Sequence, residues 1–131
     1  MKNLNKYIIS ENSSIKKAIF VINQTASQIA LVVKRQKLVG VVTDGDIRRA
    51  LLKGFKLNSK VENIMQRDYI FLLNPSSEKA ALKLMKSETL KQIPLIDKNK
   101  KLINLFLLDD LLKSKSISNE VVIMAGGKGT R

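Results

Sequence analysis

The 131-residue sequence contains no cysteine, no histidine and no tryptophan. Without cysteine there is no disulfide framework and no thiolate metal site, and without histidine the commonest metal ligand and general base is missing. No run of about 18 apolar residues predicts a membrane span. The charged first six residues are not followed by the apolar stretch of a secretory signal. These absences predict a cytoplasmic protein without a metal site and without catalytic residues of its own.

The charge balance is strongly basic, with a formal net charge of +13. Such an excess is compatible with nucleic-acid binding. The basic residues are scattered along the chain, however, and only two tyrosines and four phenylalanines could stack on bases. A lysine-rich solvated surface is therefore the favoured interpretation. The hydrophobic fraction of 44% is sufficient for a packed interior, either of one domain or of two small units that share a core.

The first half of the sequence predicts five elements in the order strand, helix, strand, strand, helix. Runs of β-branched residues indicate buried strands, and apolar residues three or four positions apart indicate helices. The expected ranges are 7–9, 15–22, 29–33, 38–42 and 46–53. Gly54 follows the last helix, as a C-terminal capping residue does.

The second half repeats this order at a spacing of 63 to 64 residues, measured between Ser13 and Ser76 and between Asp46 and Asp110. The expected ranges are 70–73, 78–85, 93–96, 102–106 and a helix that extends through 112. Pro94 predicts that its strand begins there or lies at a sheet edge, because proline cannot donate to a central ladder. A repeat of about 60 residues that keeps register through several elements indicates a duplicated module.

The segment 40–47 carries the residues best suited to bind a ligand. A strand that ends in Thr43 and turns into a helix at Asp46 places a hydroxyl and a carboxylate at a helix N-terminus, where backbone N–H groups are unpaired. The carboxylate could accept hydrogen bonds from two ribose hydroxyls. Gly40 lacks a Cβ, so a ligand or a neighbouring backbone could approach closely, and Arg48 and Arg49 nearby suit phosphate.

The same residues also fit a capping box without any ligand, in which Thr43 and Asp46 bond each other's backbone. In the second copy Asn104 and Leu107 replace the glycine and the threonine, and only Asp110 is kept. A cap is needed in both copies, so its loss in one leaves room for a ligand role in the other. Both interpretations remain open at this point.

These residues resemble a tandem pair of CBS domains, the Bateman module, over residues 4–113. Gly40, Thr43 and Asp46 match the ending of the repeat, and Val61 with Ile64-Met65 matches the connector. The resemblance implies an α+β fold of two β-α-β-β-α repeats packed as a pseudo-twofold pair. The domain ranges are then 1–59, 60–113 with the connector, and 114–131 as a linker and the start of another domain.

The same resemblance implies two clefts between the repeats, which in this family commonly hold adenine nucleotides such as AMP, ADP or ATP. Thr43 and Asp46 are then expected to hold the ribose, and Val41 to line the base pocket. Ser27 stands where some members place a basic residue that binds phosphate. Asp110 is the corresponding residue of the second cleft. No covalent cofactor is implied.

The C-terminal residues resemble the opening of sugar-phosphate nucleotidyltransferases, in which a strand precedes a glycine loop that wraps the nucleotide phosphates. The strand is 121–124, and the matching loop residues are Gly126, Gly127, Gly129, Thr130 and Arg131. A flexible glycine-rich tail is the alternative. The implied partner is a C-terminal nucleotidyltransferase domain.

Together the two resemblances imply a regulatory module that binds an adenine nucleotide, forms a homodimer and controls an attached nucleotidyltransferase. The alternative is a ligand-free dimerisation scaffold for the same enzyme.

Overall fold

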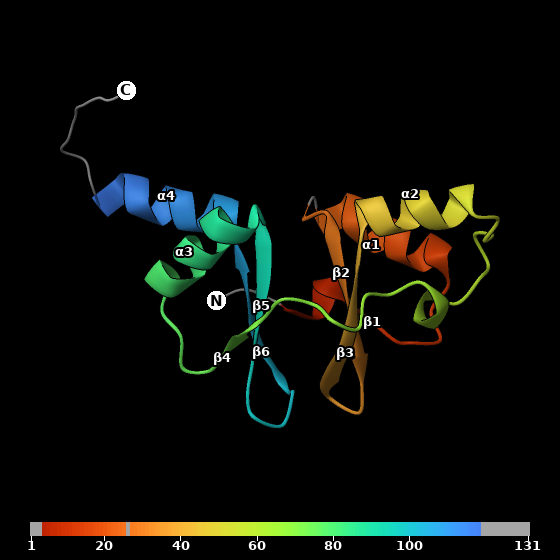
Figure 1. Cartoon of the computed structure of the whole chain (residues 1–131), viewed down its shortest axis with the longest axis horizontal. Helices are drawn as coiled ribbons and strands as arrows, with labels where there is room; N and C mark the ends of the chain where they lie inside the picture. Colours follow the sequence, from red (N-terminus) through yellow and green to blue (C-terminus); the bar gives the residue numbers. More distant parts are fainter. Residues whose placement is uncertain (1–3, 26, 119–131) are drawn as a thin grey trace.

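The computed structural model describes residues 4–25 and 27–118. Each half of the chain forms one three-stranded sheet, and the two sheets face each other at the centre of the molecule (Figure 1). Helices α1 and α2 lie on the outer side of one sheet, and α3 and α4 lie on the outer side of the other. The arrangement confirms the predicted α+β architecture of two like units.

Both halves follow the same order and the same strand pairing. The first sheet has the order β1-β2-β3 and the second β4-β5-β6, each with one parallel and one antiparallel pair. The elements of the first half are η1 (Leu4–Tyr7), β1 (Ile8–Ile9), α1 (Ile15–Thr25), β2 (Ile29–Lys34), β3 (Lys37–Thr43) and α2 (Asp44–Leu52). Those of the second half are η2 (Val61–Asn63), β4 (Leu72–Leu73), α3 (Glu78–Glu88), β5 (Gln92–Ile96), β6 (Leu102–Leu107) and α4 (Leu108–Ser118).

Several predicted boundaries need correction. Helix α2 begins at Asp44 rather than Asp46, because Thr43 is its N-cap. Strand β4 is only two residues long, and α4 continues to Ser118, five residues into the expected linker. Strand β5 begins at Gln92 and is the middle strand, so both expectations for Pro94 were wrong. The proline is tolerated because β4 pairs only with Leu95 and Ile96, which leaves β6 as the one partner of Pro94.

Three apolar clusters hold the molecule together. Two of them lie between a sheet and its own helices, one in each half. The third lies between the two sheets and joins residues of both halves, including Leu31, Val41, Ile96 and Leu105. Burying one such side chain contributes about 1.5–3 kcal/mol to the stability of the fold. The shared cluster therefore holds the two halves together as one unit.

The connector after α2 is anchored along β3. Gln66 and Val41 form a bridge with N–O distances of 2.8 and 3.1 Å. A Cβ at Gly40 would lie 2.6 Å from Met65 Sδ and 3.1 Å from the Gln66 carbonyl oxygen. The close approach at Gly40 is therefore that of the connector. Among the described helices, none is long and apolar enough to cross a membrane.

Candidate functional site

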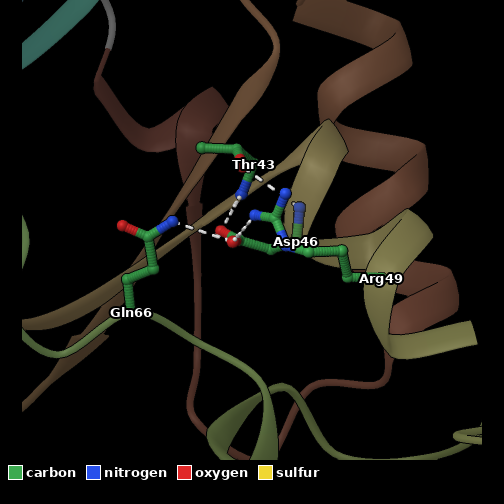
Figure 2. A network of polar contacts seen from close by, with 4 residues as sticks. All are labelled: Thr43, Asp46, Arg49 and Gln66. Atoms are coloured by element: carbon green, nitrogen blue, oxygen red, sulfur yellow. Dashed lines mark hydrogen bonds and ion pairs between the residues drawn. The ribbon is translucent and has the colours of Figure 1, made fainter. Parts of the chain in front are cut away.

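Thr43 and Asp46 form the capping box at the start of α2. The Asp46 backbone N donates to Thr43 Oγ1 at 3.2 Å, and the Thr43 backbone N donates to Asp46 Oδ2 at 2.9 Å (Figure 2). Two orphan N–H groups of the helix terminus are thereby paired. The capping interpretation of this motif is confirmed as a description of its structure. Since Asp46 has a second carboxylate oxygen, the cap does not exhaust its bonding capacity.

The second oxygen of Asp46 is also occupied. Arg49 Nη2 and Gln66 Nε2 each donate to Asp46 Oδ1 at 2.8 Å. Asp46 is 8% exposed, so its charge is buried but both paired and hydrogen-bonded, as a buried charge must be. Figure 2 shows the two donors reaching Asp46 from different elements, Arg49 from α2 and Gln66 from the connector.

A cavity of about 300 Å³ lies beside this network, between the two halves. This volume is at the lower end of the range for ligand sites, about 300–1,000 Å³. Its walls are mostly apolar, with a few polar groups from β3, the connector and β5. The lining residues are Ile29, Val41, Thr43, Gln66, Asp68, Tyr69, Ile70, Leu90, Gln92 and Pro94.

The structure brings only part of the predicted site to this cavity. Val41 and Thr43 line it, whereas Asp46 does not, although Gln66 in the lining donates to Asp46. Gly40 is covered by Met65. Arg48 is exposed and pairs with Asp44 at 3.5 Å. The arginine that reaches the network is its neighbour Arg49.

Ser27 and Asp110 belong to a different cavity, of about 370 Å³. Ser27 is buried there, and its hydroxyl donates to the Ile29 carbonyl oxygen at 3.0 Å. The same cavity is lined by three lysines, Lys6, Lys91 and Lys113. Asp110 is exposed and also borders an adjoining cavity of about 540 Å³, with Asn104 and Leu107. The predicted loop from Gly126 to Arg131 lies outside the described residues.

Three residues of the cavity beside Thr43 lie outside the predicted site. Gln66 lies in the connector, one position after the predicted Val61 and Ile64-Met65 pattern. Gln92 Nε2 donates across the halves to the Ser27 carbonyl oxygen at 2.8 Å. The Tyr69 hydroxyl donates to the Leu38 carbonyl oxygen, and partial burial raises the pKa of Tyr69. A polar residue directly after the buried Met65 is the signal that could have identified Gln66.

Known structures share this fold. A CBS domain protein from Pyrobaculum aerophilum complexed with AMP matches with a TM-score of 0.73 and 19% identity, over 92% of this chain and 97% of that chain. The structure of CBSX2 in complex with AMP matches with a TM-score of 0.71 and 17% identity, over 85% and 87%. At these identities the likeness shows a common fold.

Curated relatives are similar over most of this chain. The inosine-5′-monophosphate dehydrogenase of Methanocaldococcus jannaschii is 28% identical over 108 residues, 82% of this chain and 21% of the enzyme. The homoserine O-acetyltransferase of Methanococcoides burtonii is 33% identical over 104 residues, 79% of this chain and 21% of the enzyme. The chain spans 33% of an uncharacterised protein of Rickettsia prowazekii, to which it is 30% identical over 106 residues, 80% of this chain.

The family model for the CBS domain matches residues 3–53 and 61–116, one match in each half of the chain. These ranges coincide with the two structural repeats, each a three-stranded sheet with its helices. The chain therefore belongs to the CBS domain family and contains a tandem pair of CBS domains.

Proposed function

We propose that this CBS pair is a regulatory module that binds an adenine nucleotide in the cavity lined by Val41 and Thr43. The observation that carries the proposal is the position of this cavity, which lies between the two repeats and directly beside the Thr43–Asp46 network. The AMP complexes of the Pyrobaculum aerophilum protein and of CBSX2 support the choice of ligand, because both share the fold.

The chemistry of the cavity suits a base and a ribose. Apolar side chains such as Ile29, Val41 and Pro94 offer flat contact surface for a purine. The half-buried Thr43 hydroxyl offers hydrogen bonds for ribose hydroxyls or base edges. Such a combination of apolar walls with a few polar groups is typical of small-molecule sites.

The described lining of this cavity contains neither lysine nor arginine, and it includes the acidic Asp68. Phosphate groups of a bound nucleotide would therefore face solvent rather than a cationic side chain. Most of the affinity would come from the base and the ribose. It follows that nucleotides with one, two or three phosphates should bind with similar strength.

Titration calorimetry of the 131-residue chain with AMP, ADP and ATP tests the proposal. Saturable binding is expected, and Asp46→Ala should abolish it because the substitution removes the carboxylate and disorders the Thr43 cap. Asp110→Ala is the matched control at the same position of the second repeat, and it should have a smaller effect. Absence of binding by any of the three nucleotides would refute the proposed ligand.

We propose further that the module controls an attached sugar-phosphate nucleotidyltransferase. The support is the glycine-rich sequence from Gly126 to Arg131 that follows the CBS pair. The enzyme activity of a longer chain that includes this segment should change when the nucleotide is added. An activity that stays constant at saturating AMP, ADP or ATP would contradict the regulatory role.

A homodimerisation scaffold is the second candidate function. It is favoured by apolar side chains that helices of the first repeat leave exposed, among them Phe20 at 56% and Leu52 at 82%. Exposed apolar side chains take part in association where they form a contiguous patch. Light scattering should find a dimer that Leu52→Glu weakens, whereas a monomer at all concentrations would exclude the scaffold.

A further inference from the structure

Gln66 links the cavity beside Thr43 to the carboxylate of Asp46. Gln66 lines the cavity and donates from Nε2 to Asp46 Oδ1 at 2.8 Å, whereas Asp46 itself is absent from the lining. Asp46 instead borders a different cavity, of about 260 Å³, together with Arg49 and Lys53. A ligand in the cavity beside Thr43 therefore contacts a side chain that is bonded to the Asp46 carboxylate.

Three donors occupy three of the about four acceptor positions of the Asp46 carboxylate. Oδ2 accepts from the Thr43 backbone, and Oδ1 accepts from both Arg49 and Gln66. One position therefore remains on Oδ2, and Oδ1 is saturated. The two hydroxyls of a ribose can both donate to the carboxylate only if one of the two donors to Oδ1 leaves.

Gln66 is the donor best placed to leave. It lies on the cavity side of Asp46, its side chain is neutral, and the residue is exposed to solvent. Arg49 lines the other cavity and not the one beside Thr43, so a ligand beside Thr43 meets Gln66 rather than Arg49. Figure 2 shows Gln66 extending from the connector toward Asp46, opposite the helix that carries Arg49.

We infer that Gln66 determines ribose recognition at this site, because the two ribose hydroxyls can both bind the carboxylate only if they displace Gln66 Nε2 from Asp46 Oδ1. This inference rests on the proposed nucleotide site beside Thr43. Gln66 belongs to the connector, so ligand binding would move a side chain of the segment that joins the two repeats. Gln66 is a specificity-determining residue in this view, and Asp46 is the group for which it competes with the ribose.

The inference predicts a gain of affinity when the competing donor is removed. A hydrogen bond to a charged group contributes about 1.5–3 kcal/mol, and about 1.4 kcal/mol corresponds to tenfold in affinity. Gln66→Ala should therefore bind AMP about tenfold more tightly than the unmodified chain. The gain should be absent for 2′,3′-dideoxy-AMP, which has the same base and phosphate but no ribose hydroxyls that could bind Asp46.

Calorimetry of the 131-residue chain and two variant classes tests this directly. Gln66→Met has nearly the side-chain length of glutamine without the donor, so it should show the same gain if Gln66→Ala folds poorly. Gln92→Ala is the matched control, because Gln92 lines the same cavity but donates to Ser27 rather than to Asp46. It removes the same atoms from the cavity wall and should produce no gain.

Several outcomes would overturn the inference. Equal or weaker AMP binding by both Gln66 variants would mean that Gln66 holds the ligand rather than competing with it. An equal gain for 2′,3′-dideoxy-AMP, or a similar gain in Gln92→Ala, would mean that cavity size alone is responsible. Absence of binding by the unmodified chain and by every variant would refute the proposed nucleotide site itself.

Discussion

Replacing Asp46 with alanine should lower the free energy of unfolding, because one carboxylate serves three donors. The substitution leaves the Thr43 backbone N and Gln66 Nε2 without their acceptor. A hydrogen bond to a charged group contributes about 1.5–3 kcal/mol. The ion pair with Arg49 adds little, because that side chain is 63% exposed and exposed pairs contribute about 0–1 kcal/mol.

Water can reach part of the vacated site, so the two hydrogen bonds will not be lost at full strength. We expect a total loss of about 2–4 kcal/mol, in line with the loss of a helix cap and one further polar contact. For a chain of this size the loss corresponds to a fall in melting temperature on the order of 10 °C. Urea denaturation followed by circular dichroism gives both the midpoint and the slope.

Asp110→Ala is the matched control, since Asp110 occupies the same position of the second repeat but is exposed. Its free energy of unfolding should stay within about 1 kcal/mol of the unmodified chain, as for most surface substitutions. If Asp46→Ala were equally mild, the network around Asp46 would not contribute to stability as its geometry implies. A large effect of Asp110→Ala with a small effect of Asp46→Ala would reverse the assignment of the two repeats.

Three further predictions follow from other parts of the structure. AMP, ADP and ATP should bind the 131-residue chain within about threefold of each other, as measured by calorimetry. The described cavity wall has no Lys or Arg that could bond an added phosphate, and one such charge-assisted bond would change the affinity by about tenfold or more. A steep rank order among the three nucleotides would contradict this. Burial raises the pKa of Tyr69 above 10.0 in the folded chain. The contribution of the neutral Tyr69 side chain to stability is therefore complete below about pH 10, and it is lost as the pH rises through the raised pKa of the folded state. The stability difference between the unmodified chain and Tyr69→Phe should therefore shrink above about pH 10, and a constant difference in urea denaturation would refute it. Gly40→Ala should lower the free energy of unfolding by about 1–3 kcal/mol, because the new methyl group would overlap Met65. If the variant unfolds at the same urea concentration as the unmodified chain, the connector moves away from Gly40 at no cost, and the prediction is wrong.

Local patterns in the sequence predicted the elements that depend on local chemistry. Apolar, β-branched runs and the helical spacing of apolar residues identified both repeats, and Thr43 with Asp46 marked the start of α2 to within two residues. These features involve residues only a few positions apart, because a helix or a strand fixes which near neighbours in the sequence share a face. The end of α4 was missed, because Ser- and Lys-rich helical turns have no apolar periodicity.

The sequence by itself determined that the chain is a duplicated α+β module with a hydroxyl and a carboxylate at one helix start. Only the tertiary structure decided which residues share a cavity. Gln66 reaches Asp46 across 20 positions and Gln92 reaches Ser27 across 65, so no local pattern could pair them. The bridge between Val41 and Gln66 holds the connector on β3, and the packing of the two sheets brings the start of β5 to the cavity beside Thr43. The tertiary structure also places Ser27 and Asp110 at a different cavity, and it puts Gln66 in contact with both the cavity beside Thr43 and Asp46.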